Sequence, residues 1–400
     1  MNKLFIKDES IIRKEYLPYG RQMIDEDDIA AVVEVLKGDY LTTGPKVDEF
    51  EQKIAEYVGA KYAVAVTNGT AALHIAMLTA GIKEGDEVIV SPLTFVASAN
   101  CILYCGGTPV FVDVEPDTGN IDVSKIEEKI TNKTKAIIGV DFAGHPVEID
   151  KILEICNKHN LIFIEDSAHG LGSEYKGKKV GSMAHMTMFS FHPVKPITTG
   201  EGGVITTNSE ECYKKLKLFR SHGITRDKDE LLNREEGQWY YEQQYLGYNY
   251  RIPDINCALG ISQLKKIDKF IERRRKIVHI YNEAFKDIDW IIPPTEREYV
   301  KSGYHIYTIK IREEVLGLTR KEVFNTLQEY NIGVNVHYMP IYLQPYYKKI
   351  GYEQGLCINS EKIYEVSITL PLHSSMTKAD IEYVIKALLK LNLQNNLIYN

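Results

Sequence analysis

Between about residue 20 and residue 260, short runs rich in β-branched residues alternate with segments of helical periodicity. This alternation is typical of a largely parallel sheet with helices on both faces, because parallel strands need long crossover connections. The predicted strands are 61–66, 86–91, 108–114, 135–141, 161–166, 186–191 and 202–207, with helices predicted at 70–81 and 148–160. We therefore expect an α/β fold built on one large sheet.

The pattern changes near residue 260. One long amphipathic helix is predicted over 251–285, and it is followed by a strand at 304–311, a helix at 319–330, a strand at 333–338 and a terminal helix at 377–393. A chain of 400 residues exceeds one compact core. We expect a large domain with an N-terminal arm over residues 1–260 and a smaller α/β domain over 261–400. The charged and aromatic segment 227–247 is predicted to be a surface excursion.

Charge and composition exclude several classes of protein. The net charge of −7 argues against a nucleic-acid partner, which would require clustered Lys and Arg. No apolar stretch approaches the roughly 20 residues of a membrane helix, and charges interrupt the first 20 residues too often for a secretory signal. We expect a soluble protein of the cytoplasm. The cysteines lack metal-ligand spacing, and a metal site at Asp166, His185 and His192 is disfavoured on the same ground.

Three stretches could carry chemistry, and each follows a predicted strand. The first is "TNGT", residues 67–70, which runs directly into a predicted helix. Bare backbone N–H groups at a helix start, with a glycine for close approach, suit the binding of phosphate. Taken alone, the stretch is better explained by a simple helix cap with Thr or Asn at the N-cap.

The second stretch is "IEDSAH", in which the predicted strand 161–166 ends in Glu165 and Asp166, with His169 just beyond. Carboxylates at the carboxyl end of a buried strand lie where doubly wound sheets bind ligands. A helix cap by Asp166 or Ser167 is the alternative interpretation.

The third stretch is "SFHPVKPITTGEGG", which places Lys195 between Pro193 and Pro196. Proline restricts the backbone of the residue before it, so Lys195 is held in extended geometry on a loop that leaves a strand. A surface lysine in a proline-rich turn is the alternative. Together, a phosphate site, a carboxylate and a fixed amine match pyridoxal 5′-phosphate, which carries a phosphate, a ring nitrogen and an aldehyde.

The chain resembles the DegT/DnrJ/EryC1/StrS family of sugar aminotransferases over nearly its whole length. The resemblance is carried, in the family's order, by "LPYGRQMIDEDDI", "TNGTAALHIAML", "PLTFVASAN", "IEDSAHGLGSEYKGKKVGS", "SFHPVKPITTGEGG", "HGITRD", "GYNYRIPDINCALGISQL" and "VHYMPIY". It implies the fold type I architecture of PLP-dependent transferases, as in aspartate aminotransferase. The first and fifth segments are most similar to those of the transaminases of pseudaminic acid biosynthesis.

The resemblance also implies roles for individual residues. Lys195 would form the Schiff base with the cofactor and shuttle protons, and Asp166 would keep the ring nitrogen protonated. The other implied cofactor contacts are Gly69, Thr70 and Ser190 to the phosphate, Phe95 stacked on the ring, and His169 against the cofactor.

A second subunit is implied as well, because Asn249 would reach from it to the phosphate and make a homodimer with shared active sites. Contacts to the nucleotide sugar are implied for Thr43, Arg226 and Tyr338.

The implied reaction moves an amino group from L-glutamate to C4 of a UDP-linked 4-keto-6-deoxy-N-acetylhexosamine in two half-reactions. Three alternatives remain open. A sugar dehydratase of the same family would carry histidine in place of the lysine, which Lys195 argues against. A non-catalytic regulator could retain the fold. The third alternative is an aminotransferase for another keto sugar, substituted at C3 or C4, or carried on dTDP or GDP.

Overall fold

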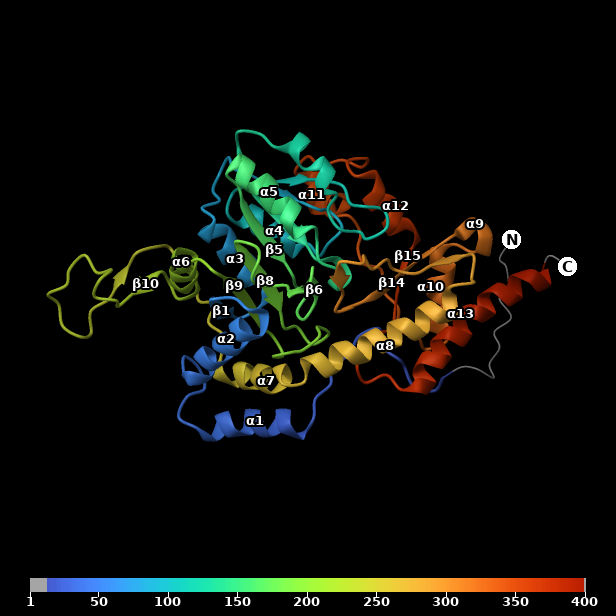
Figure 1. Cartoon of the computed structure of the whole chain (residues 1–400), viewed down its shortest axis with the longest axis horizontal. Coiled ribbons are helices and arrows are strands. Elements are labelled where there is room, and N and C mark those ends of the chain that lie inside the picture. Colours follow the sequence, from blue (N-terminus) through green and yellow to red (C-terminus); the bar gives the residue numbers. More distant parts are fainter. Residues whose placement is uncertain (1–12, 399–400) are drawn as a thin grey trace.

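In the computed structural model of the chain, residues 13–398 are described. The predicted strands of the N-terminal part are all present and pair into one seven-stranded sheet, in the order β1-β9-β8-β5-β4-β2-β3 (Figure 1). Their bounds are β1 Tyr62–Val66, β2 Glu87–Val90, β3 Thr108–Phe111, β4 Thr134–Val140, β5 Ile162–Asp166, β8 Met186–Ser190 and β9 Gly203–Thr207. The expected α/β fold with a mostly parallel sheet is confirmed.

One strand of this sheet, β9, runs antiparallel to both of its neighbours, β1 and β8. Residues 191–202 join β8 to β9 without a crossover helix, so the chain turns back beside the strand that it has just left. Gly203 at the start of β9 pairs with Ser190. A Cβ added at Gly203 would lie 2.5 Å from the carbonyl oxygen of Asn68, so the start of β9 must pass directly against the N-terminus of the helix that follows β1, α3 (Gly69–Thr79).

The strand side chains alternate between two hydrophobic cores, one on each face of the sheet. In β5, for example, Phe163 belongs to one core and Ile164 to the other. The first core includes side chains of α2 (Pro45–Val58), α5 (Ile149–His159) and α7 (Asp254–Leu264). The second includes side chains of α3 (Gly69–Thr79), α4 (Ala97–Tyr104) and α6 (Glu210–Arg220). Helices therefore cover both faces, as the sequence pattern predicts.

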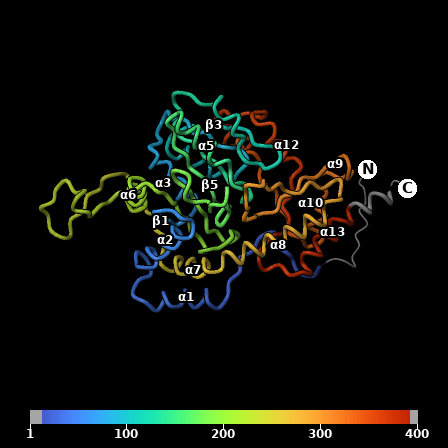
Figure 2. The backbone as a smooth tube through the Cα atoms, viewed as in Figure 1, coloured from blue at the N-terminus to red at the C-terminus, as the bar shows by residue number. Residues whose placement is uncertain are grey.

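The C-terminal part contains a second, three-stranded antiparallel sheet of β12 (Ile291–Ile292), β14 (Tyr307–Ile311) and β15 (Ser367–Leu370). Its core includes side chains of α8 (Ile267–Phe285), α10 (Arg320–Glu329) and α13 (Lys378–Ile398). Figure 2 traces the chain from α7 through α8 into this part. The shorter elements are α9 Glu313–Leu316, α11 Pro345–Lys349, α12 Ile358–Val366 and the small sheet of β13 Val300–Lys301, β6 Glu174–Tyr175 and β7 Lys178–Lys179. The domain boundary near residue 260, which lies within α7, stays a prediction.

Two predicted elements differ from the structure. The single helix predicted over 251–285 is broken into α7 and α8 at residues 265–266. At the break the Lys266 ammonium is held 2.6 Å from Asp25 and 2.7 Å from Asp28, beside α1 (Glu26–Lys37). The strand predicted at 333–338 is also wrong, because this segment turns to line a cavity and only Asn335 pairs, in an isolated bridge.

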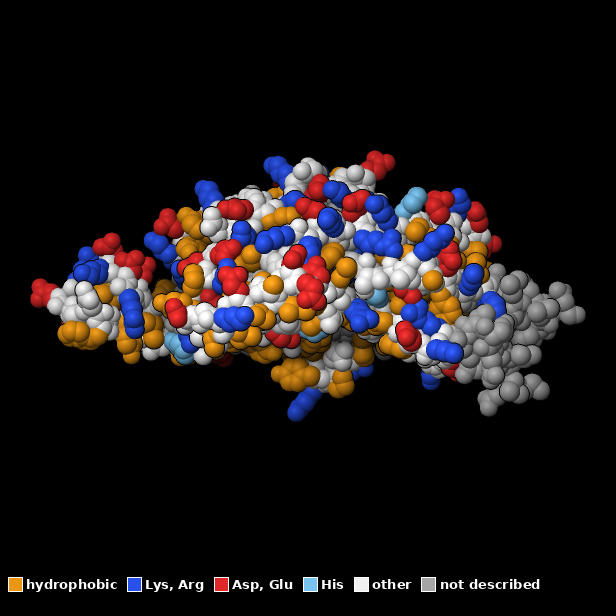
Figure 3. All heavy atoms as spheres, turned by 90° about the horizontal axis from the view of Figure 1, so that it is seen from below, with side chains coloured by type: hydrophobic (Ala, Val, Ile, Leu, Met, Phe, Trp, Pro, Cys, Tyr) orange, Lys and Arg blue, Asp and Glu red, His pale blue; other side chains and the backbone are white. Residues whose placement is uncertain are grey.

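The segment predicted to be a surface excursion projects from the body as a hairpin, with the short strands β10 (Ile224–Thr225) and β11 (Glu242–Gln243) near its base (Figure 1). Three of its apolar side chains are strongly exposed: Leu232 to 90%, Trp239 to 76% and, just beyond β11, Leu246 to 79%. Figure 3 shows hydrophobic side chains on this projecting lobe, at the left of the view. Over residues 13–398, no helix is long and apolar enough to cross a membrane.

Candidate active site

A cavity of about 1020 Å³ lies where β5 and β8 end and α3 begins. Ligands of doubly wound sheets bind at this carboxyl edge of the strands. The cavity brings together most of the residues that the sequence predicts for the site: Gly69, Thr70, Phe95, Asp166, His169, Ser190, Lys195 and Tyr338. We call it the lysine cavity.

The predicted phosphate site is formed by the start of α3 and the end of β8. Gly69 and Thr70 are the first residues of the helix, and the Asn68 side chain caps it by accepting a hydrogen bond from the Ala71 N–H at 2.8 Å. A Cβ added at Gly69 would lie 3.1 Å from the Cβ and 3.3 Å from the Oγ of Ser190. The Ser190 hydroxyl is thus close to the uncovered first turn, where free N–H groups favour an anion.

Asp166 is the last residue of β5 and is 4% exposed. Its Oδ2 accepts a hydrogen bond from the Ser98 hydroxyl at 2.6 Å, and its Oδ1 accepts one from the Ala168 N–H at 3.2 Å. Burial raises the pKa of Asp166, while these hydrogen bonds and the charge of Lys195 oppose the rise. The carboxylate is therefore held in a buried place by donors that favour its ionised form.

Lys195 lies in the loop between β8 and β9, where its N–H donates to the carbonyl oxygen of His192 at 2.9 Å. The side chain lines the lysine cavity and is partly buried. Burial lowers the pKa of Lys195 to about 8, and the charge of Asp166 opposes that shift. A lysine acts as a nucleophile through its neutral amine, so the environment increases the fraction of the reactive form at neutral pH.

His169 is buried at the wall of the cavity, and its ring centroid lies 4.3 Å from that of His305. Its Nε2 is 3.4 Å from the hydroxyl of Tyr338, whereas its Nδ1 is buried without a partner within the described chain. Burial holds the pKa of His169 well below its usual range, and the positive charge of Lys195 lowers it further. The imidazole is therefore neutral and has one ring nitrogen free for a ligand.

Several lining residues escape the sequence analysis: Tyr19, His74, Thr94, Ser98, His305, Asn335 and His337. Ser98 lies only three positions beyond Phe95 in the quoted stretch "PLTFVASAN", so its hydroxyl is a local signal that could have been used. His305 comes from the C-terminal part, and its N–H donates to Ala143 at 3.0 Å. No local pattern connects His305 to the loops at the end of β5.

Three predicted residues do not line the cavity of their own chain. Thr43 is exposed before α2 with a φ of 57°, and Arg226 lies on the projecting hairpin with its guanidinium 5.7 Å from the centre of the Tyr241 ring. Asn249 is exposed and forms a bridge with Ser221. The family resemblance implies that Asn249 contacts the phosphate in the site of a second subunit. Its absence from the cavity of its own chain therefore does not test that prediction.

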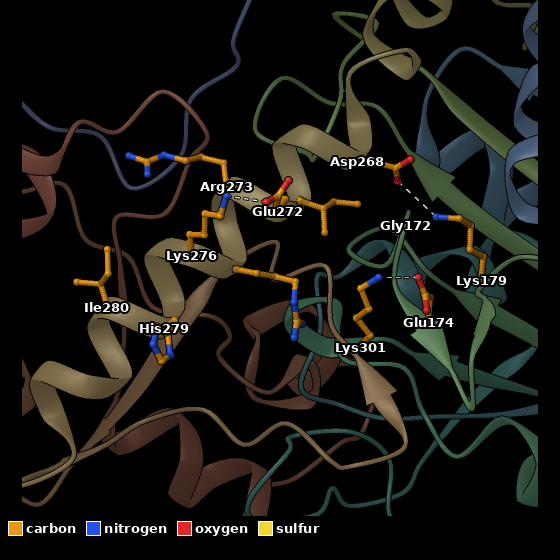
Figure 4. Close-up of a pocket in the computed structure, with 12 residues that line it drawn as sticks. Gly172, Glu174, Lys179, Asp268, Glu272, Arg273, Lys276, His279, Ile280 and Lys301 are labelled. Carbon is orange, nitrogen blue, oxygen red and sulfur yellow. Dashed lines mark hydrogen bonds and ion pairs between the residues drawn. The ribbon is translucent and has the colours of Figure 1, made fainter.

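A second cavity, also of about 1020 Å³, lies between α8 and the β13-β6-β7 sheet (Figure 4). We call it the basic cleft, because lysines and arginines line much of it. Its lysines already have acidic partners: Lys179 with Asp268 at 3.4 Å, Lys301 with Glu174 at 2.9 Å and Lys276 with Glu272 at 2.6 Å. The chemistry is assigned to the lysine cavity, because that cavity is lined by both a lysine and a buried carboxylate at the carboxyl edge of the sheet.

The residues of the lysine cavity fit pyridoxal 5′-phosphate. The first turn of α3 and Ser190 suit the phosphate, Asp166 suits a protonated ring nitrogen, and Lys195 suits the aldehyde. The space at Gly69, which a Cβ would fill, and the orphaned Nδ1 of His169 both indicate a bound group. Within residues 13–398, no three His, Cys, Asp or Glu side chains gather as metal ligands.

Comparison with solved structures gives matches over nearly the whole chain. The aminotransferase PseC of Helicobacter pylori, described as involved in the biosynthesis of pseudoaminic acid, has a TM-score of 0.88 at 35% identity, over 95% of this chain and 100% of that one. The putative sugar aminotransferase Spr1654 of Streptococcus pneumoniae, in its PLP form, has a TM-score of 0.87 at 32% identity, over 95% and 99% of the two chains.

Comparison of sequences gives relatives of the same kind. A UDP-4-amino-4,6-dideoxy-N-acetyl-beta-L-altrosamine transaminase of Campylobacter jejuni is 42% identical over 371 residues, which are 92% of this chain and 95% of the relative. A UDP-4-amino-4-deoxy-L-arabinose--oxoglutarate aminotransferase of Shewanella sediminis is 35% identical over 382 residues, 94% and 97% of the two chains.

The fold, together with a cavity built on a lysine and a carboxylate, places the chain among the aminotransferases. Residues 22–389 match the DegT/DnrJ/EryC1/StrS aminotransferase family, and the protein belongs to that family. The family resemblance drawn from the sequence motifs is thereby confirmed.

Proposed function

We propose that this protein is a PLP-dependent aminotransferase that transfers the amino group of L-glutamate to C4 of a UDP-linked 4-keto-6-deoxy-N-acetylhexosamine, as pseudaminic acid biosynthesis requires. The observation that carries the proposal is the meeting of Lys195, Asp166 and the open start of α3 in one cavity. The UDP-linked sugar is supported by the names of the Campylobacter relative and of PseC. The glutamate donor is supported by the Shewanella relative, whose name specifies oxoglutarate.

The cavity residues divide the binding of the cofactor among them. Gly69 and Thr70 would offer N–H groups and a hydroxyl to the phosphate, together with the hydroxyl of Ser190. Phe95 and His169 would contact the ring. When bound, pyridoxal 5′-phosphate withdraws electrons from the carbon that carries the amino nitrogen and makes its proton acidic.

Asp166 would accept a hydrogen bond from the protonated ring nitrogen. This role needs an ionised carboxylate in a buried place, which burial alone disfavours. The hydrogen bond from Ser98 at 2.6 Å and the nearby charge of Lys195 both lower the pKa and so favour the ionised form.

Lys195 would move the protons of the reaction. In its neutral form, Nζ can accept the proton from Cα of the amino donor, and in the second half-reaction it can deliver a proton to C4 of the sugar. A pKa of about 8 allows the amine to act in both directions near neutral pH. Tyr338, whose hydroxyl lies 3.4 Å from His169 Nε2, would contribute to the binding of the sugar nucleotide from the same cavity.

We further propose that a second copy of the chain completes each site. The projecting hairpin exposes the apolar side chains of Trp239 and Leu232 to solvent. Such exposure does not stabilise a single subunit and is typical of a surface that contacts another protein. Phe95 at the cavity is 59% exposed. A homodimer in which Asn249 of one subunit contacts the phosphate in the other would bury such surfaces, and Thr43 and Arg226 would contact the nucleotide sugar from their exposed loops.

The first test fixes the cofactor to its lysine. The protein loaded with pyridoxal 5′-phosphate is reduced with borohydride, and the modified peptide is identified by mass spectrometry. We expect the modification at Lys195, and we expect Lys195→Ala to lose both the modification and transamination. Lys179→Ala, in the basic cleft, is the matched control and should keep both. Modification of another lysine would overturn the assignment.

The second test concerns the sugar. Amination with glutamate is measured over UDP-, dTDP- and GDP-linked 4-keto and 3-keto sugars. Amination of non-UDP sugars alone would contradict the proposed substrate. Another UDP-linked 4-keto sugar is a second candidate substrate, because the Shewanella relative is named for an arabinose.

Turnover of any keto sugar would exclude the alternative of a non-catalytic regulator. The location of the protein in the cytoplasm stays a prediction.

A further inference from the structure

Two buried hydroxyls lie behind Asp166 and form a chain that ends on its carboxylate. Ser98 is in the first turn of α4 and is 1% exposed, and Thr94 is 5% exposed. The Ser98 Oγ lies 2.6 Å from Asp166 Oδ2 and 2.9 Å from Thr94 Oγ1. Asp166, Ser98 and Thr94 all line the lysine cavity, and Thr94 and Ser98 lie on the same segment as Phe95.

The direction of the hydrogen bonds in this chain follows from the charge of Asp166. A serine hydroxyl has one hydrogen to donate, and an ionised carboxylate can only accept. If Asp166 is ionised, Ser98 must donate to Oδ2, and the second contact must then be Thr94 donating to Ser98. The hydrogen of Ser98 thereby points toward the carboxylate and that of Thr94 toward Ser98, and this alignment stabilises the buried negative charge.

We propose that Ser98 is a positioning residue for the amination reaction: supported by Thr94, it holds the Asp166 carboxylate ionised and fixed through Oδ2, which leaves Oδ1 for the ring nitrogen of the cofactor. This inference rests on the proposed function. Oδ1 carries only the longer contact, 3.2 Å, from the Ala168 N–H, and so retains a lone pair. Without Ser98, the carboxylate loses a charge-assisted hydrogen bond and its fixed orientation.

The test compares pyridoxal 5′-phosphate with its 1-deaza analogue, in which a C–H group replaces the ring nitrogen. Binding of each to cofactor-free protein is measured for the wild type and for Ser98→Ala. We expect the variant to bind pyridoxal 5′-phosphate about 10- to 100-fold more weakly, the range for the loss of a hydrogen bond to a charged group. Binding of the deaza analogue should change by less than about 2-fold, because it offers nothing to Asp166.

Two further variants sharpen the comparison. Thr94→Val removes the outer hydroxyl and should show a smaller loss of affinity that is again confined to pyridoxal 5′-phosphate, so it carries the test if Ser98→Ala fails to fold. Ser91→Ala is the matched control, since Ser91 is also 1% exposed but its hydroxyl has no hydrogen-bond partner within the described chain. It should leave the binding of both compounds unchanged.

The outcomes separate this inference from the function on which it rests. An equal loss of affinity for both compounds would mean that Ser98 only supports the packing of α4, and unchanged affinities would mean that Asp166 does not need it; either result overturns the inference. A wild-type protein that binds neither compound would instead overturn the proposed function, and the inference with it.

Discussion

The amine of Lys195 should be far more reactive than that of an ordinary lysine even before any cofactor binds. Burial lowers its pKa to about 8, whereas an unperturbed lysine has a pKa of about 10.4. At pH 7 the neutral fraction is then about 9%, against about 0.04% for the unperturbed group, which is an enrichment of about 200-fold. The neutral amine is the form that attacks an aldehyde, so the rate of cofactor attachment should rise as well, by less than this factor because a less basic amine is a weaker nucleophile.

Competitive labelling measures this pKa directly. Cofactor-free protein is labelled with acetic anhydride across roughly pH 6 to 11, and the labelling of the peptide that contains Lys195 is quantified by mass spectrometry. The exposed Lys228 serves as an internal reference. Labelling of Lys195 should rise with pH, reach half its maximum near pH 8 and then level off, because the lowered pKa releases the proton earlier.

A variant of Asp166 tests the cause of the shift. The negative charge of Asp166 raises the pKa of Lys195 against the effect of burial. Asp166→Asn removes that charge, so the midpoint of labelling should move to lower pH, even though transamination is lost. A wild-type midpoint above about 10, or a midpoint that rises in Asp166→Asn, would refute the reasoning.

Three further predictions concern the phosphate site, the second subunit and the core. Gly69→Ala places a methyl group 3.1 Å from the Cβ of Ser190; overpacking of this kind should weaken the binding of pyridoxal 5′-phosphate at least about 5-fold in a titration, with the fold intact. Lys195→Ala and Asn249→Ala should each be inactive alone. After subunit exchange in an equal mixture, half of the dimers contain one variant subunit of each kind and so have one intact site of two, and about a quarter of the wild-type activity should return. No recovery of activity would contradict shared sites. Arg274 is 2% exposed and donates to the carbonyl oxygens of Leu372 and His305 at 2.9 and 3.1 Å. Arg274→Met should lower the free energy of unfolding, measured in urea, by about 3 kcal/mol. Lys276→Met, on the exposed side of the same helix, is the control and should change this free energy by less than about 0.5 kcal/mol.

Much of the fold could be predicted because the strands of the large sheet are buried on both faces. Such strands appear as short apolar runs, and the runs at 161–166 and 186–191 locate β5 and β8 closely. The direction of β9 could not be predicted, because it depends on the path of the loop before it and not on the strand residues. The break between α7 and α8 was missed for a similar reason, since the acidic partners of Lys266 come from the distant segment at Asp25 and Asp28.

The residues of the site could be predicted where they lie in a short stretch directly after a predicted strand. Asp166 and Lys195 each follow a predicted strand, and the carboxyl ends of neighbouring strands meet at one edge of the sheet. His305 could not be found in this way, because the C-terminal part brings it to His169 only through tertiary packing. Asn249, Arg226 and Thr43 lie outside this cavity, and their roles stay predictions.

The reversed strand β9 has a consequence for how the lysine loop tolerates change. Ser190 and Gly203, at the two ends of residues 191–202, pair with each other, and the Phe191 N–H donates to the Gly202 carbonyl at 2.9 Å. The two ends of the loop are therefore held together by the pairing of β8 with β9, as the ends of an Ω-loop lie close together. Ile197, Thr198 and Thr199 beyond the lysine are each 3% exposed or less, so we expect a change of loop length to disturb buried packing and with it the position of the amine.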